Sequence, residues 1–440
     1  MKITNTIFNY IYINYIPQIS MKNITTFLSQ LLLHWKRSKK SFYTLFPLLL
    51  LCLLAYNAFT IFLAPPEPVF FLPDHVVGKT TTIPSSKPPP PLQNSTTPEN
   101  RNSTIPTNIN AIYRPKKSQR QSQRRALEIL TSSKNVPKRF EARVKKFFRT
   151  GSNCESRFFM TWISSVDSFG DREFFSIESL FKSHPNGCLI IVSRSMDSKK
   201  GLRILQPFLK KGFKVTAISP DFNYLFKKTA AQSWYNRLKH GDINPGLVPI
   251  GQNLSNLLRI GLLYRFGGIY LDTDVIVLKS FVELRNVIGA QTVNLVTGNW
   301  SRLNNAVMIF DKGHPLLLEF IDEFAKTFNG NKWGHNGPYL VSRVVSRVSR
   351  NVSGYNFTVL APVAFYPVGW RKIGSLFEGP TSLSHSRWIV EKVKHIRRQS
   401  FGVHLWNKQS RNCKVENGSV IQHILFRSSA LRNCSVLPKL

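Results

Sequence analysis

Two aspartates one residue apart, Asp272 and Asp274, lie inside the apolar run GGIYLDTDVIVL. The chain has 60 lysines and arginines against 23 acids, and these two are the only acids between Asp242 and Glu283. In a strand, residues i and i+2 point to the same side, so we expect both carboxylates to project together. A divalent cation would relieve their repulsion, and a hard cation held by few carboxylates usually shares its coordination sphere with substrate phosphates. The spacing therefore predicts a metal site for a nucleotide diphosphate.

A solvated turn is the alternative interpretation, because a bare D-x-D pattern is common by chance. The flanking segments IYL and VIVL argue against it, since they would bury two unpaired acids at a cost of several kcal/mol each. We therefore expect one strand to run through both aspartates.

Strand and helix patterns alternate from about Phe158 onward. The segments RFFMTWIS, GCLIIVS and FKVTAI predict buried strands, and the apolar spacing between Phe174 and Phe181 predicts a helix. This order predicts an α/β fold with a mostly parallel sheet flanked by helices. Ligands of such sheets bind beyond the carboxyl ends of the strands.

A second set of elements surrounds the two aspartates. NLSNLLRIGLLYRF predicts a helix that ends at Gly267 and Gly268, because glycine tolerates the left-handed conformation of a helix end. NNAVMIF predicts a strand, whereas PLLLEFIDEFAKTF and GPYLVSRVVSRV predict helices. The aspartates should thus lie between a helix and a buried strand.

The N-terminal third predicts a membrane anchor and a stem. Residues 42–64 are uncharged and long enough to cross a bilayer, and the basic residues before them place residues 1–41 in the cytosol. A cleaved signal peptide is the alternative, but its apolar region would be shorter and earlier. Residues 65–150, first rich in proline and then basic, predict a stem, and residues 151–440 predict a lumenal domain. Translation starts at Met1 or at Met21.

The basic part of the stem has two interpretations. Residues 114–149 carry 13 lysines or arginines against two glutamates. The run is either a solvated linker or exposed helix, or a segment attracted to acidic headgroups or to a partner. Nucleic acid is excluded as a partner of a lumenal segment.

Cysteines and glycosylation sequons agree with a lumenal location. Four cysteines follow the apolar span and allow three pairings, of which we expect Cys154 with Cys188 and Cys413 with Cys434. The acceptor tripeptides N-x-S/T stand at Asn94, Asn102, Asn253, Asn299, Asn351, Asn356, Asn417 and Asn433.

Four blocks of sequence resemble one family. SNLLRIGLLYRFGGIYLDTDVIVL is similar to the DXD sugar-binding region of glycosyltransferases. NNAVMIFDKGHPLLLEFIDEF, GHNGPYLVSRV and GVHLWNK resemble successive blocks of the α-1,4-glycosyltransferase family, in order along roughly the last two thirds of the chain. The resemblance implies a nucleotide-sugar-binding fold of the GT-A type behind one N-terminal transmembrane helix. It further implies a UDP-sugar donor, Mn²⁺, retention of anomeric configuration, a glycan or glycolipid acceptor and a type II protein of the Golgi membrane.

The resemblance also assigns roles around the two aspartates. Asp272 would bind the ribose or the donor sugar and assist the metal, and Asp274 would be the direct metal ligand. In related enzymes an acid and an arginine three residues apart hold the donor on the preceding helix, and here these positions are Asn256 and Arg259. Arg259 fits a phosphate. Asn256 departs from the pattern because its amide has no charge, and it could equally be ordinary helix polarity.

Further residues are implied by the later blocks, each with an ordinary alternative. His404 would be an additional metal ligand, or else a histidine of the core. Trp406 would stack on sugar or uracil, or pack in the core. The remaining candidates for sugar contacts, with helix-start or turn duty as the alternative, are Asn304, Asn305, His335, Gly337 and Pro338.

The residues leave the retaining mechanism and the substrates open. Asp311, Glu319 and Asp322 lie in the appropriate block, but none is assigned as a nucleophile, and attack on the same face as the leaving group needs none. By resemblance galactose is the leading donor sugar. Transfer of α-mannose from GDP-mannose or of N-acetylglucosamine is the alternative reaction, and a homo- or hetero-oligomer with other transferases stays open. A glycan-binding protein without turnover and a basic adaptor acting through residues 114–149 are the non-enzymatic alternatives.

Overall fold

The computed structural model describes residues 140–149, 154–349 and 354–431. The expected anchor at residues 42–64 and most of the expected stem lie outside these ranges. Within them, no helix combines the length and the apolar composition needed to cross a membrane.

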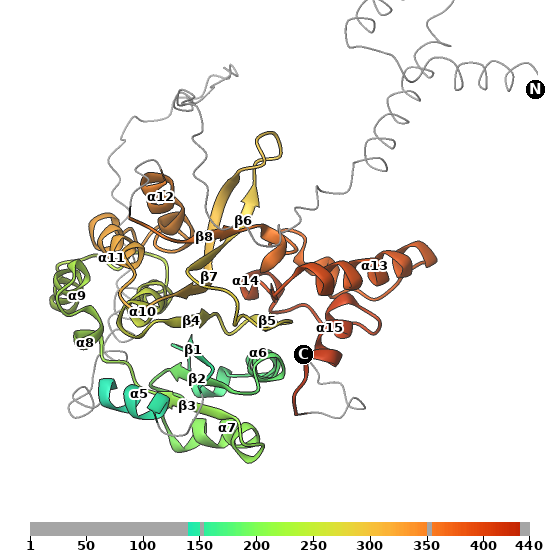
Figure 1. Ribbon diagram of the computed structural model, residues 1–440, viewed down its shortest axis with the longest axis horizontal. Helices are drawn as coiled ribbons and strands as arrows, with labels where there is room; N and C mark the ends of the chain where they lie inside the picture. The colour runs from blue at the N-terminus through green and yellow to red at the C-terminus, as the bar shows by residue number, and fades with distance from the viewer. Residues whose placement is uncertain (1–139, 150–153, 350–353, 432–440) are drawn as a thin grey trace, which may run out of the picture. The chain divides into compact units, whose positions relative to one another are not determined.

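A seven-stranded sheet forms the centre of the described domain (Figure 1). Its order is β3-β2-β1-β4-β7-β6-β8. Four of its six pairings are parallel, and the two made by β7, with β4 and with β6, are antiparallel. The strands are β1 (Ser156–Thr161), β2 (Gly187–Val192), β3 (Lys214–Ile218), β4 (Gly268–Leu271), β6 (Val287–Val293), β7 (Trp300–Phe310) and β8 (Thr358–Leu360). The expected α/β fold with a mostly parallel sheet is confirmed.

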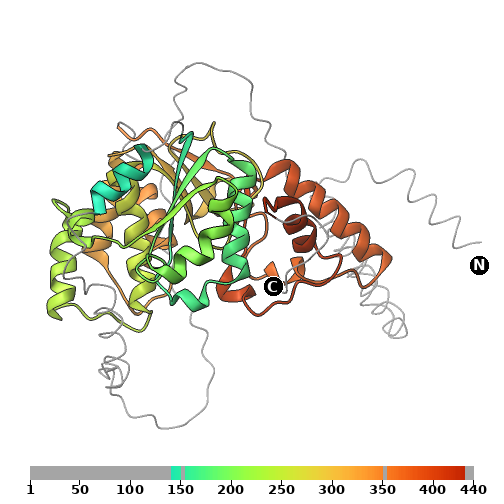
Figure 2. The same ribbon diagram turned by 90° about the horizontal axis from the view of Figure 1, so that it is seen from below.

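Helices cover both faces of this sheet, and Figure 2 shows the two layers from below. Side chains alternate along β1, with Phe158 in one buried cluster and Phe159 in the other. The first layer holds α6 (Asp171–Ser183), α7 (Lys199–Lys210), α13 (Leu383–Gln399) and α15 (Val420–Ser428). The second holds α5 (Phe140–Arg149), α8 (Phe222–Phe226), α9 (Ala230–His240), α10 (Ile250–Phe266), α11 (Pro315–Thr327) and α12 (Pro338–Val348). A short helix, α14 (Asn407–Ser410), follows β9 (Gly402–His404).

Helix α5 belongs to the folded domain. Phe140, Val144 and Phe148 are buried in the second layer, and Arg143 forms an ion pair of 2.7 Å with Asp197. The end of the basic run is therefore an amphipathic helix packed on the sheet, and the folded unit includes residues before the predicted boundary at residue 151.

The segment that carries the two aspartates is a turn and not a continuous strand. The Val275 N–H donates to the Asp272 carbonyl at 3.2 Å, which closes the turn. β4 before it belongs to the main sheet, whereas β5 (Val275–Val277) pairs antiparallel with β9 in a separate two-stranded sheet. The prediction of one strand through both acids is wrong. Its energetic premise fails because both carboxylates have partners at this turn, so neither is buried unpaired.

The pair Gly267 and Gly268 ends α10, as predicted, and both residues have positive φ. A Cβ on Gly268 would lie 2.6 Å from the Arg157 carbonyl oxygen of β1. The glycines thus let β4 enter the sheet directly after the helix.

The disulfide between Cys154 and Cys188 is confirmed. It joins the start of β1 to the start of β2. The expected partner of Cys413, Cys434, lies outside the described residues, so that pairing stays a prediction.

Candidate functional site

Three predicted metal ligands meet where β4 and β9 end. One donor atom from each of Asp272, Asp274 and His404 lies within 4.8 Å of the others. Asp272 directly follows β4, Asp274 directly precedes β5, and His404 is the last residue of β9. The cluster therefore lies at the carboxyl end of β4, where ligands of such sheets are expected.

Asp274 forms the buried half of the cluster with His404. Its Oδ1 lies 3.2 Å from His404 Nε2, and its Oδ2 accepts the Asn407 N–H at 2.8 Å. Burial alone would raise the pKa of Asp274, but His404 and the Asn407 N–H hold the pKa below its usual value. Burial would likewise lower the pKa of His404, and Asp274 raises it above its usual value. The two groups favour each other's charged form.

Asp272 forms the other half with Arg259. Arg259 Nη1 donates to Asp272 Oδ2 at 3.1 Å, and Nη2 lies 3.0 Å from Asp272 Oδ1, so the contact is bidentate. The Arg259 side chain is 2% exposed and also donates to the Asn305 carbonyl at 2.7 Å. Burial would lower the pKa of Arg259, whereas Asp272 and Tyr270 raise it. The geometry thus turns Arg259 toward Asp272, and its predicted contact with a phosphate stays a prediction.

A network of hydroxyl groups holds Asp272 and Arg259 in place. Tyr270 donates its hydroxyl to Asp272 Oδ1 at 2.9 Å and contacts Thr161 Oγ1 at 2.8 Å. Thr161 in turn lies 2.7 Å from Ser255 Oγ, which accepts from Arg259 Nη2 at 3.2 Å. β1, β4 and α10 are thereby joined under Asp272.

The sequence analysis missed Tyr270, Thr161, Ser255 and Asn407. Tyr270 could have been found, because residues i and i+2 of a strand share a face and Tyr270 stands two before Asp272. Ser255 could also have been found, because it stands four residues before Arg259 on the same helix. Thr161 could not, since its contacts cross more than 90 residues of chain. Asn407 acts through its backbone N–H, which no residue type reveals.

Asn256 lies in a buried amide cluster beside the start of α12. Its Oδ1 accepts from Asn305 Nδ2 at 3.0 Å, and a Cβ on Gly337 would lie 2.8 Å from the same oxygen. Gly337 therefore lets the loop before α12 approach Asn256, while Pro338 is the first residue of that helix. The structure brings Asn256, Asn305 and Gly337 together behind Arg259.

The other predicted sugar contacts have partners within the protein. Asn304 donates to Gln291 Oε1 at 3.0 Å, on the side of β7 opposite to that of Asn305. His335 Nε2 lies 2.8 Å from the Thr327 carbonyl. Trp406 is 8% exposed, donates its indole N–H to the Val368 carbonyl at 2.9 Å, and places its ring 4.3 Å from that of His404. Trp406 is therefore arranged to fix the orientation of His404.

The cluster suits a divalent cation. Two carboxylates and an imidazole are the donor types that Mn²⁺ and similar ions accept. His404 Nδ1 is buried without a hydrogen-bond partner among the described residues. A cation held by Asp274 and His404 would bind the neutral imidazole and so compete with the proton for His404. Within the described residues no third carboxylate joins this cluster.

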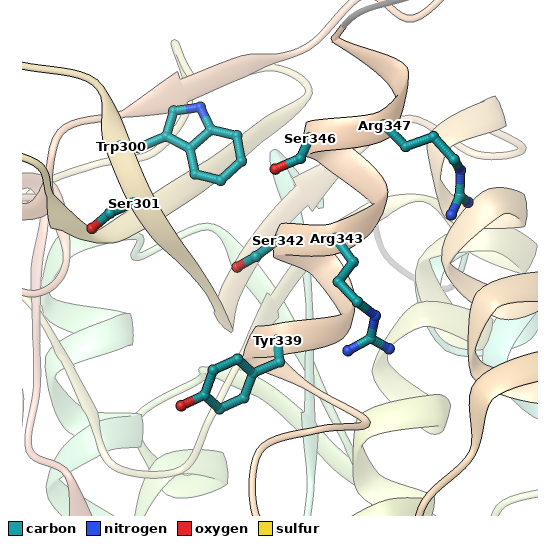
Figure 3. A pocket seen from close by; sticks show the side chains of 7 residues that line it. All are labelled: Trp300, Ser301, Tyr339, Ser342, Arg343, Ser346 and Arg347. Atoms are coloured by element: carbon teal, nitrogen blue, oxygen red, sulfur yellow. The ribbon is translucent and has the colours of Figure 1, made fainter. Parts of the chain in front are cut away.

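A separate groove of about 520 Å³ lies between β7 and α12. Figure 3 shows Ser342 and Ser346 pointing toward Trp300 and Ser301, and Arg343 and Arg347 pointing away. The arginines form ion pairs with Glu323 of α11 at 3.0 and 2.8 Å. The groove shares no residue with the aspartate cluster, and its arginines are engaged in holding α12 to α11.

Family models match the chain in the two regions that build the cluster. The glycosyltransferase sugar-binding region containing the DXD motif matches residues 170–294, which include both aspartates and α10. The alpha 1,4-glycosyltransferase conserved region matches residues 309–435, which include α12 and His404.

Curated relatives extend the match. Lactosylceramide 4-alpha-galactosyltransferase of Mus musculus is 32% identical over 250 residues, which are 55% of this chain and 64% of that protein. The Pongo pygmaeus protein of the same name is 33% identical, and the match covers 44% of this chain and 84% of that protein. Alpha-1,4-N-acetylglucosaminyltransferase of Homo sapiens is 26% identical over 48% of this chain and 58% of that protein. As its four sequence blocks predicted, the chain belongs to the α-1,4-glycosyltransferase family, whose members are glycosyltransferases.

Proposed function

We propose that this protein is a retaining glycosyltransferase that moves a hexose from a UDP-sugar to a hydroxyl group of a glycan or glycolipid, in α linkage and with Mn²⁺. The observation that carries the proposal is the cluster of Asp272, Asp274 and His404 at the end of β4. It unites residues from both family regions, because Asp272 and Asp274 lie in the first region and His404 lies in the second.

Each residue of the cluster has a distinct part in this proposal. Asp274 and His404 would hold the metal directly, and Asp272, held by Arg259, would assist them. A bound divalent ion would supply positive charge against the diphosphate as it leaves. Arg259 and Tyr270 hold Asp272 in one orientation, and Trp406 does so for His404. The protein's own contribution is thus a preorganised set of ligands.

Retention is best explained by attack on the face from which the diphosphate leaves. A double displacement needs a carboxylate nucleophile opposite the leaving group. Asp311 contacts Arg285 and Asn286, and Glu319 contacts Arg347, so both are engaged in structural pairs. No third carboxylate belongs to the metal cluster in the described part of the chain. Same-face attack requires only the cation and an acceptor hydroxyl held close to the sugar carbon.

Galactose is the favoured donor sugar, because two relatives are named as galactosyltransferases. The names of these relatives specify lactosylceramide as the acceptor, which makes a lactose-bearing glycolipid the first acceptor to test. N-acetylglucosamine is the second candidate, since a further relative carries that name. Asn256 is uncharged and already bonded to Asn305, so it would contribute only an amide to sugar recognition.

The decisive experiment measures transfer by the full chain, purified in detergent from a secretory host. We expect UDP release and an α-linked product from one UDP-sugar in the presence of Mn²⁺, with loss of both on chelation and in Asp274→Asn. GDP-mannose and UDP-N-acetylglucosamine test the alternative donors. A protein that binds UDP and Mn²⁺ but forms no product from any donor and a panel of acceptors would instead favour a glycan-binding role. The basic adaptor is the better account if, in cells that depend on this protein, Asp274→Asn leaves the phenotype unchanged while deletion of residues 114–139 reproduces loss of the protein.

We also propose that the domain is lumenal, in a type II protein of the Golgi membrane. The apolar residues 42–64 and the disulfide between Cys154 and Cys188 support this location. Sequon mapping tests it, because Asn299, Asn356 and Asn417 are exposed whereas Asn253 is buried and bonded to Asn336. We expect glycans on the exposed group and none on Asn253. A protein without glycans at any sequon, or with its tail in the lumen by protease protection, would contradict the location.

A further inference from the structure

An exposed tryptophan lies beside the aspartate cluster. Trp333, in the loop between α11 and α12, is 49% exposed. Lys408 Nζ lies 3.7 Å from the centroid of its ring. Lys408 follows Asn407, whose N–H donates to Asp274 Oδ2 at 2.8 Å. Lys408 is therefore the direct chain neighbour of the residue that binds the buried aspartate.

The loop that presents Trp333 is firmly held. Asn336 accepts the Asn329 N–H at 3.0 Å, and its Nδ2 donates to the Asn329 carbonyl and to Asn253 Oδ1 of α10. The Val248 N–H donates to the Gly330 carbonyl at 2.8 Å. The exposure of the indole is thus set by a fixed backbone. A rigid aromatic side chain at the surface offers a large apolar contact face that loses little entropy on binding.

The contact with Lys408 is weak enough to be exchanged. A cation above an aromatic ring at an exposed site contributes about 0.5–1 kcal/mol. An ammonium gains more from a doubly charged diphosphate, and the flexible lysine stem allows it to move. Arg259 is buried and bound to Asp272, whereas Lys408 is exposed and directly follows Asn407, whose N–H binds Asp274. The ammonium of Lys408 can therefore move from the Trp333 ring toward a donor diphosphate.

We propose that Trp333 is the platform on which the acceptor sugar stacks, and that Lys408 covers it until a donor diphosphate draws the ammonium away. The inference rests on the proposed function and adds to it a residue for the acceptor and an order of binding. The apolar face of a terminal hexose of the acceptor is the ligand. Donor binding uncovers the indole, and acceptor binding follows.

The test measures each half of the site separately on the full chain in detergent. UDP binding with Mn²⁺ reports the donor half, and lactose binding with and without UDP and Mn²⁺ reports the acceptor half. We expect UDP and Mn²⁺ to tighten lactose binding to the unmodified protein. Trp333→Ala should weaken lactose binding about tenfold, as expected for loss of one stacked aromatic, and change UDP binding by less than about twofold. Trp333→Phe should retain part of the affinity.

A variant of Lys408 tests whether its ammonium blocks the Trp333 ring in the absence of the donor. Lys408→Met should weaken UDP binding, yet bind lactose without UDP more tightly than the unmodified protein does. Trp388→Ala is the matched control, because Trp388 is 40% exposed on α13 and touches His385 instead of the cluster. It should leave both affinities unchanged.

Three outcomes would overturn the inference. First, Trp333→Ala could bind lactose as tightly as Trp388→Ala does, which would show that Trp333 is not the acceptor platform. Second, Trp333→Ala could weaken the binding of UDP and of lactose equally, which would place Trp333 in the donor site. Third, lactose could bind equally well with and without UDP while UDP binds normally, which removes the order of binding. Absence of UDP binding in the unmodified protein is different, since it contradicts the proposed function itself.

Discussion

Asp272 and Asp274 are one residue apart, yet the protein treats them in opposite ways. The Asp272 side chain is 27% exposed and is neutralised by a fully buried arginine. The Asp274 side chain is 10% exposed and is paired with an imidazole and a backbone N–H. One carboxylate has a permanent positive partner, whereas the other has a partner whose charge depends on a proton.

This difference divides the work between the two residues. A carboxylate held on both oxygens by Arg259 has a fixed direction but little negative charge left to attract a cation. Asp274 retains that attraction, because a cation can replace the proton on His404. We infer that Asp272 shapes the site and Asp274 binds the ion.

The largest effect is expected from Asp274→Asn. It removes the charge that would hold the ion and should lower transfer by about a thousandfold, which corresponds to several kcal/mol of lost charge stabilisation. Mn²⁺ affinity, measured by calorimetry, should fall with it, while the free energy of unfolding should fall less than in Asp272→Asn, because His404 can lose its proton and Arg259 cannot. Asp272→Asn is the matched comparison. It should lower the free energy of unfolding, because it leaves Arg259 buried without a counter-charge, and it should change Mn²⁺ affinity little. Equal effects of both variants on Mn²⁺ affinity would remove the distinction.

Arg259→Gln should have the next largest effect, and on stability more than on metal binding. Loss of one partner of a buried ion pair typically costs about 3 kcal/mol. Urea unfolding should show this loss, with Arg259→Lys intermediate because a lysine keeps the charge but not the bidentate geometry. Mn²⁺ affinity should be unchanged or higher, since a positive charge has left the neighbourhood. A protein of unchanged stability that no longer binds Mn²⁺ would show that Arg259 does not serve Asp272.

The sequence predicted which side chains come together at this site better than it predicted the local backbone. Asp272, Asp274 and His404 were named from residue types and family blocks, because a metal restricts which side chains can serve. The turn between β4 and β5 was missed, since the apolar runs on either side resemble one strand. Two different sheets receive those runs, and which sheet a strand joins depends on the distant strands β7 and β9.

The contact between Arg259 and Asp272 was not predicted, for a related reason. Its spacing from Asn256 fitted a phosphate contact, and guanidinium groups bind phosphate and carboxylate equally well. Only the packing of α10 against β4 brings the side chain to Asp272. Asn304 and Asn305 likewise look equivalent in the sequence, but they contact Gln291 and Asn256 respectively.

Tyr270→Phe should produce a smaller effect on the Asp272 half. It removes a hydroxyl that joins Thr161 to Asp272, at an expected cost of about 1 kcal/mol in the free energy of unfolding. A double-mutant cycle with Thr161→Val should show coupling between the two changes. Mn²⁺ affinity should not change in Tyr270→Phe, because Asp274 and His404 keep their contacts. Additive effects would mean that the network does not act as a unit.

The smallest effect concerns a second comparison, between His404 and His184, which are both buried. His404 faces a carboxylate, whereas His184 lies between the rings of Phe158 and Phe281 and accepts the Phe281 N–H at 2.8 Å. Burial lowers the pKa of His184 to about 4, so the two histidines shift in opposite directions. The environment, and not burial itself, decides the sign.

This shift predicts a loss of stability in mild acid. An unfolded histidine has a pKa of about 6.5, so between that value and the folded pKa of about 4 the unfolded chain binds more protons. Stability contributed by neutral His184 is therefore present above pH about 6.5 and declines as the pH falls, by about 1 kcal/mol between pH 7 and 5.5. Urea unfolding at both pH values should show this decline in the unmodified protein and a smaller one in His184→Gln. Because His404 is present in both proteins, its opposite contribution cancels in the difference, and an identical pH dependence would contradict the shift.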